Sequence, residues 1–99
     1  MTADRVEFSP EALAELEELT AYIADRNPDA AERVRADILS AATRLALPAP
    51  RVDGPAAMLR AGVPCRRTFV HPVMIYYRRA PGVVQVLRVY HHAREPIAR

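Results

Sequence analysis

The stretch from Val73 to Tyr90 reads VMIYYRRAPGVVQVLRVY, and it decides the fold. Two runs in it, Val73–Arg78 and Val83–Tyr90, are rich in β-branched and aromatic residues, which favour strands. Between them lies Ala80-Pro81-Gly82, whose proline and glycine favour a tight turn. The stretch therefore predicts a β-hairpin.

A third strand is expected just before this hairpin. Arg66–Val70 has strand character and is separated from Val73 only by His71-Pro72. Such short spacing predicts an antiparallel meander of three strands. Residues 48–64 hold several prolines and glycines, so we expect an irregular connector there.

Two helices are predicted in the first half of the chain. Ser9-Pro10-Glu11 and Asn27-Pro28-Asp29 each combine a capping residue, a proline and an acid, which is typical of a helix start. Apolar residues then recur at helical spacing over about 10–25 and from 28 to about 47. The short connection, Arg26-Asn27, predicts an antiparallel helical hairpin.

Residues 1–99 are thus expected to form a single α+β domain with the element order β-α-α-β-β-β, since Arg5–Phe8 also alternates as a short strand does. The helical hairpin should cover one face of a small antiparallel sheet. Strict alternation places Val73, Ile75 and Tyr77 on one face and Met74 and Tyr76 on the other. In Val83–Tyr90 the same alternation places Val83, Leu87 and Val89 on one face and Val84, Val86 and Tyr90 on the other. Both faces are then apolar, and a second protein segment is one candidate cover for the face without helices.

The charge is divided unevenly along the chain. Residues 1–50 carry five arginines and ten acidic residues, whereas residues 51–99 carry nine arginines and two acidic residues, and there is no lysine. Arginine binds carboxylate and phosphate groups through two parallel hydrogen bonds. The second half therefore predicts an anionic partner: an acidic peptide, a phosphate backbone or an acidic protein surface.

Several classes of protein and site are not expected. Met1–Arg5 lacks the apolar run of a leader peptide, and no stretch is long and apolar enough to span a membrane. The single cysteine, Cys65, precludes an internal disulfide, and we expect a cytoplasmic protein. His71, His91 and His92 lack neighbouring ligand residues, so no metal is expected, and neither is a cofactor or a small-molecule substrate.

Several segments together resemble the ParE/RelE toxin superfamily, and the resemblance runs from Phe8 to Pro96. The matching segments are Phe8–Ala12, Leu16–Leu19, Tyr22–Ala24, Asn27-Pro28, Gly62–Arg67, Val73–Arg78 and Val86–Arg94. Members of this superfamily are toxins of bacterial type II toxin–antitoxin systems. The resemblance implies a helical hairpin on an antiparallel sheet and a partner antitoxin whose flexible C-terminal segment wraps the toxin. ParE-type members are associated with plasmid stabilisation and with poisoning DNA gyrase, and RelE-type members with cutting messenger RNA on the ribosome.

The chemistry of RNA cleavage distinguishes the RelE-type members from the ParE-type members. RNA cleavage through the 2′-hydroxyl needs proton transfer and stabilisation of a charged phosphorane. The resemblance implies a basic residue in the central strand of a nuclease, and the matching position here is Met74, which cannot stabilise that charge. This favours a ParE-like gyrase poison with no catalytic residues and a ParD-like antitoxin. The alternatives are a RelE-like ribonuclease and a non-toxic protein-binding module.

The candidate site residues follow from these alternatives. For binding the antitoxin or the target they are Arg66, Arg67, Arg78, Arg79, Arg88, His91 and Arg94. For the ribonuclease alternative they are Arg67, Tyr90, His92 and Arg94.

Overall fold

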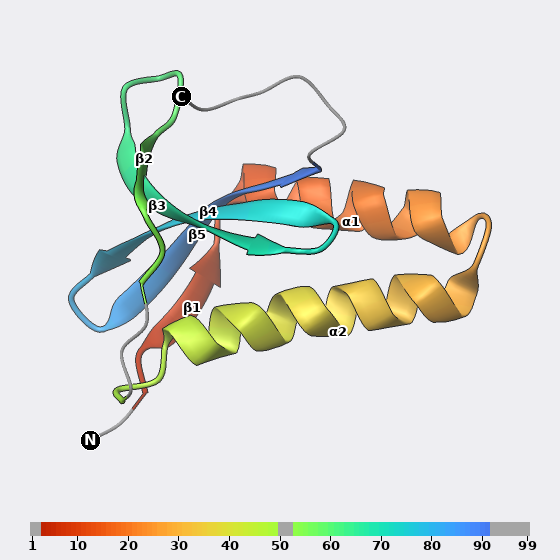
Figure 1. Ribbon diagram of the computed structural model, residues 1–99, viewed down its shortest axis with the longest axis horizontal. Coiled ribbons are helices and arrows are strands. Elements are labelled where there is room, and N and C mark those ends of the chain that lie inside the picture. The colour runs from red at the N-terminus through yellow and green to blue at the C-terminus, as the bar shows by residue number, and fades with distance from the viewer. Residues whose placement is uncertain (1–2, 50–52, 92–99) are drawn as a thin grey trace.

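The computed structural model shows two helices on one side of a five-stranded sheet (Figure 1). It describes residues 3–49 and 53–91. The elements are β1 Arg5–Phe8, α1 Pro10–Ala24, α2 Pro28–Leu45, β2 Ala56–Met58, β3 Pro64–Val70, β4 Val73–Ala80 and β5 Val83–His91. The predicted α+β class and the helical hairpin are confirmed.

Both helix starts are capped as predicted. The Ser9 side chain accepts a hydrogen bond from the Ala12 N–H at 3.0 Å, and the Asn27 side chain accepts one from the Ala30 N–H at 3.1 Å. A proline follows each cap, where its missing N–H costs nothing. The helices end one to two residues earlier than predicted.

The sheet order is β1-β5-β4-β3-β2, and it differs from the prediction at both edges. β3, β4 and β5 form the predicted antiparallel meander. β1, however, pairs with β5 in parallel, from Arg5 opposite Val83 to Phe8 opposite Val86, so the sheet is mixed. At the other edge the connector contains β2, which pairs with Pro64–Arg66 of β3. β2 is only three residues long, too short for its alternation to be recognised among the surrounding prolines and glycines.

A β-bulge changes which faces the β5 side chains reach. Tyr76 pairs with Arg88 but Tyr77 pairs with Val86, so Leu87 is the extra residue. An extra residue shifts the alternation of everything after it by one position. Val84, Val86 and Val89 consequently all pack in clusters that include helix residues, while Leu87 and Tyr90 belong to a cluster without them. The predicted grouping of β5 side chains was therefore wrong beyond Val86, whereas that of β4 is confirmed.

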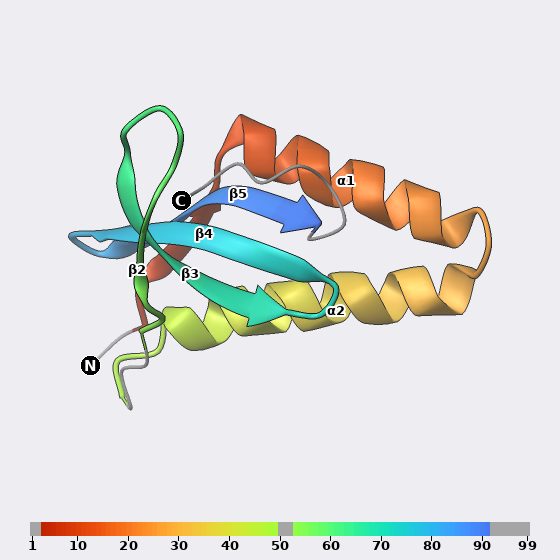
Figure 2. The same cartoon turned by 45° about the horizontal axis from the view of Figure 1, so that its top comes forward.

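The main core lies between the helices and the sheet (Figure 2). Ala12 and Leu16 of α1 and Ile38 of α2 pack there against Val73 and Ile75, and all five are at most 2% exposed. Burying each of the larger aliphatic side chains contributes roughly 1.5–3 kcal/mol. The small residues Ala12, Ala41 and Ala42 let both helices approach the sheet closely. Within residues 3–49 and 53–91, no helix has both the length and the apolar character needed to cross a membrane.

Candidate functional site

The sheet face away from α1 and α2, called the outer face here, separates the predicted arginines. Neighbouring residues of a strand point to opposite faces. Arg67 lies opposite Tyr76, and both belong to the outer face, whereas Arg66 lies opposite the core residue Tyr77 on the helix side. Arg78 and Arg79 divide in the same way, since Arg79 lies opposite the core residue Val84. The predicted arginines therefore do not form one patch.

Arg79 is held within the molecule. Its Nε lies 2.9 Å from Oδ1 of Asp53, and its Nη1 donates to the Leu45 carbonyl at 2.8 Å. The hydroxyl of Tyr77 donates to the same Asp53 oxygen at 3.1 Å and accepts the Gly54 N–H at 2.9 Å. We call these contacts the Tyr77–Asp53–Arg79 network. The network fastens the connector and the end of α2 to β4. Burial of the Tyr77 side chain raises its pKa.

Arg88 is held by a helix. Its Nη2 lies 2.6 Å from Oε2 of Glu15, and its Nε donates to Oε1 at 2.9 Å. Oε1 also accepts the Val89 N–H at 3.0 Å. The hydrogen bond to Glu15 raises the pKa of Arg88. Glu15 thereby joins α1 to the part of β5 that lies beyond its pairing with β1.

Arg66, Arg67 and Arg78 are more available to a partner. Arg66 donates to the Gly54 carbonyl at 2.9 Å, and Arg78 donates to the Gln85 side chain at 2.7 Å; both are exposed. Arg67 is half-buried on the outer face. His91 lies at the end of β5 opposite Val73. Arg94 and His92 lie outside the described residues.

Of the four residues predicted for a ribonuclease site, Arg67 and Tyr90 lie within the described part of the chain. A second tyrosine, Tyr76, lies beside them and was not predicted from the sequence. Tyr76 and Tyr90 pack with Cys65 in an outer-face cluster to which the half-buried Met74 adds its thioether. Burial raises the pKa of Tyr76, an effect that the positive charge of Arg67 partly opposes. A phenol with a raised pKa is suited to donating a hydrogen bond and poorly suited to acting as a general base. The register of β3 and β4 is what brings Arg67 and Tyr76 together, and no spacing in the sequence shows it.

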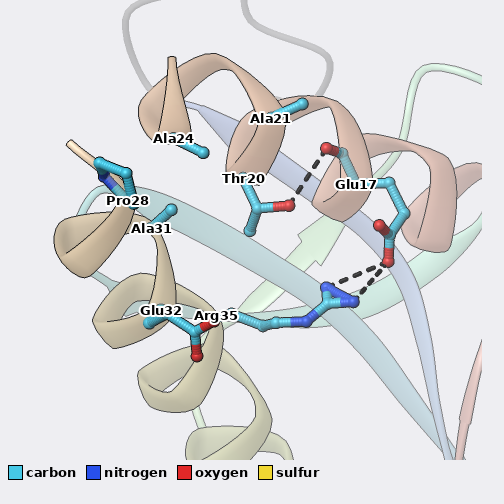
Figure 3. Close-up of a pocket in the computed structure, with 8 residues that line it drawn as sticks. All are labelled: Glu17, Thr20, Ala21, Ala24, Pro28, Ala31, Glu32 and Arg35. Atoms are coloured by element: carbon cyan, nitrogen blue, oxygen red, sulfur yellow. Dashed lines mark hydrogen bonds and ion pairs between the residues drawn. The ribbon is translucent and has the colours of Figure 1, made fainter. Parts of the chain in front are cut away.

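A hollow of about 350 Å³ lies between α1 and α2 near the tip of the hairpin (Figure 3). It is lined by Glu17, Thr20, Ala21, Ala24, Pro28, Ala31, Glu32 and Arg35. Arg35 and Glu17 bind each other across it at 2.7 Å, and the Thr20 hydroxyl is bonded to the α1 backbone. The Arg35–Glu17 ion pair joins α2 to α1. Within the described part of the chain, no three metal-ligating side chains gather anywhere.

Comparison with known proteins agrees with this architecture. The family model for the ParE toxin of the type II toxin–antitoxin system parDE matches residues 6–96. A solved structure described as the chromosomal ParDE TA system from P. aeruginosa superimposes with a TM-score of 0.73 at 17% sequence identity, covering 90% of this chain and 96% of that chain. At that identity the match concerns the fold. No curated protein sequence matches significantly.

Proposed function

The chain belongs to the ParE toxin family of type II toxin–antitoxin systems, and from this premise we propose that it poisons DNA gyrase and is neutralised by a ParD-like antitoxin. The proposal includes action in the cytoplasm and a role in plasmid stabilisation. It assigns the protein to a class that acts by binding a macromolecule. The antitoxin is then its physiological partner.

The observation that carries the proposal is the chemistry of the outer face. Met74, on the central strand β4, presents a thioether where a ribonuclease needs a cation to stabilise the phosphorane. Its neighbour Tyr76 has a raised pKa and is only 6% exposed. This supports a toxin that binds its target over one that cuts RNA. Among the described arginines, Arg66, Arg67 and Arg78 are the proposed contacts, because Arg79 and Arg88 are held in ion pairs.

A gyrase assay tests the proposal. The purified protein should inhibit supercoiling of relaxed plasmid by gyrase and should cause linear, cleaved plasmid to accumulate. Reversal of charge in the double variant Arg67→Glu/Arg78→Glu should weaken both effects, while Arg33→Glu on α2 should leave them unchanged. Full supercoiling at a large excess of folded protein would exclude gyrase as the target.

The ribonuclease remains a second candidate because Arg67, Tyr76 and Tyr90 lie together on the outer face. In a translating extract it requires transcript cuts that disappear on Arg67→Ala. If cuts appear, the gyrase proposal loses its chemical basis. If neither gyrase nor transcripts respond and expression does not arrest growth, the protein is a binding module.

A further inference from the structure

The end of β3 carries an exposed aromatic ring on the outer face of the sheet. Phe69 lies opposite Met74 of β4, which packs in the outer-face cluster, so strand alternation places the Phe69 ring on that face too. The side chain is 53% exposed, and its ring meets the ring of His71 edge-on with 6.3 Å between the centroids. An exposed ring that a neighbour holds in place is suited to stacking on a flat partner.

Two arginines continue from Phe69 along the outer face. Arg67 precedes Phe69 by two residues on β3, and Arg78 lies on β4 two residues after Tyr76, the partner of Arg67. Residues two apart on a strand are about 7 Å apart, and diagonal neighbours on paired strands are about 7–8 Å apart. The three side chains therefore form a row across the outer face, which we call the Phe69–Arg67–Arg78 row.

The surroundings of this row are positive. Within residues 3–49 and 53–91, neither Arg67 nor Arg78 forms an ion pair, and Arg78 donates to the neutral side chain of Gln85 at 2.7 Å. Glu7 is the single acidic residue in the five strands, and β5 and β4 separate its strand, β1, from β3. The acidic residues of α1 and α2 belong to the layer on the other side of the sheet (Figure 2). The row therefore favours a polyanion.

We propose that the Phe69–Arg67–Arg78 row binds single-stranded DNA, with a base stacked on Phe69 and phosphates held by the two arginines. A nucleotide supplies both groups that the row needs, since phosphates bind arginine through two parallel hydrogen bonds and bases stack on aromatic rings. An acidic peptide supplies only the first, because the negative face of an aromatic ring repels a carboxylate. A duplex is a poorer ligand, because its bases already stack on one another. The inference rests on the proposed function only for the choice of DNA over RNA, since cleaved DNA exposes strand ends.

Binding of a fluorescein-labelled single strand of deoxythymidine nucleotides, measured by fluorescence anisotropy without gyrase, tests the row. Phe69→Ala should weaken binding roughly fivefold or more through loss of the stacked base, and it should leave the salt dependence unchanged. Arg67→Gln and Arg78→Gln should each reduce the slope of log affinity against log salt by about 0.7, the value for one phosphate contact on a single strand. The two signatures distinguish the role of the ring from that of the guanidinium groups.

Two residues outside the row provide matched controls. Tyr22→Ala removes an aromatic ring that is 57% exposed and lies 5.0 Å from the guanidinium carbon of Arg26, but on α1. Arg66→Gln removes an exposed arginine of β3 that lies on the helix side of the sheet. Neither control should change the affinity or its salt slope appreciably. Circular dichroism and thermal unfolding establish that each variant is folded, which is expected for Phe69 and Arg78 because both side chains are exposed.

The inference is overturned if the strand does not bind at low salt, if Phe69→Ala and Tyr22→Ala weaken binding equally, or if a duplex binds as tightly as the single strand. Tighter binding of the matching uridine strand would make RNA the ligand and overturn the assignment to DNA.

The supercoiling assay is read separately from strand binding. Poisoned gyrase without strand binding would overturn this inference and leave the proposed function standing. Strand binding with both signatures, but with gyrase unaffected, would support the row and exclude gyrase as the target.

Discussion

At the scale of single residues, the hydroxyl of Tyr77 connects segments far apart in the sequence. The ring is fully buried, and its oxygen is bonded to both Asp53 and Gly54. Tyr77→Phe keeps the packing but leaves the Gly54 N–H without this acceptor. We expect the free energy of unfolding to fall by about 1–3 kcal/mol, the usual cost of leaving a buried polar group unsatisfied. Urea unfolding measures it. Tyr22→Phe, at a residue 57% exposed, should change it by less than about 0.5 kcal/mol.

Burial of tyrosines also predicts how stability depends on pH. Burial raises the pKa of Tyr76 and Tyr77 above the ordinary value of 10.0, so the folded protein holds these protons more tightly than the unfolded chain does. Their contribution is complete below that ordinary value and is lost as the pH rises through the folded pKa. Urea midpoints measured from about pH 8 to about pH 11 should therefore fall at the alkaline end. The fall should be smaller in Tyr77→Phe than in the unmodified protein. Equal falls in the two proteins would show that Tyr77 does not contribute to it.

At the scale of elements, α1 protects the part of β5 that lies beyond the end of β1. Strand edges with free N–H and C=O groups invite pairing with other chains. Here the Ser9 hydroxyl donates to the Leu87 carbonyl at 2.7 Å, and Glu15 accepts the Val89 N–H. The helix thus satisfies edge groups that a longer β1 would otherwise bond. It also prevents strand addition along this edge.

Glu15 is the residue that tests this role. In Glu15→Ala the Val89 N–H and the half-buried Arg88 both lose an acceptor, so we expect a loss of about 1–3 kcal/mol in the free energy of unfolding. Hydrogen exchange of the Val89 amide should speed up more than that of amides in β4. Glu15→Gln keeps one acceptor oxygen and should show the smaller change in both measurements. Exchange at Val89 that is as slow in Glu15→Ala as in the unmodified protein would mean that Glu15 does not protect the edge.

The sequence predicts elements better than it predicts edges and faces. Local signals such as Ser9-Pro10 and Asn27-Pro28 act within one turn of helix, so the helix starts were predictable. The parallel pairing of β1 with β5 depends on contacts between residues nearly eighty positions apart. The bulge at Leu87 leaves no mark in a run of apolar residues, yet it decides which side chains reach the core. The separation of Arg66 from Arg67 follows from simple alternation and was foreseeable, but the capture of Arg79 by Asp53 and of Arg88 by Glu15 needed the fold.

At the scale of the whole molecule, the charge asymmetry of the sequence becomes an asymmetry between layers. β3, β4 and β5 together contain five arginines and no acidic residue. α1 and α2 contain seven acidic residues and three arginines. The separation gives the molecule a dipole that should orient an acidic partner toward the sheet before contact.

This dipole predicts that salt acts on the rate of association. Long-range attraction between exposed charges is screened by salt, whereas short-range apolar contacts are not. The association rate constant of toxin and antitoxin should therefore fall roughly tenfold from low to high salt, while the dissociation rate constant changes little. Stopped-flow fluorescence measures both. The triple variant Arg66→Glu/Arg67→Glu/Arg78→Glu should associate slowly at low salt and lose most of the salt dependence. An association rate that does not respond to salt in the unmodified protein would show that the sheet arginines do not guide the encounter, and the affinity would then depend on apolar contacts.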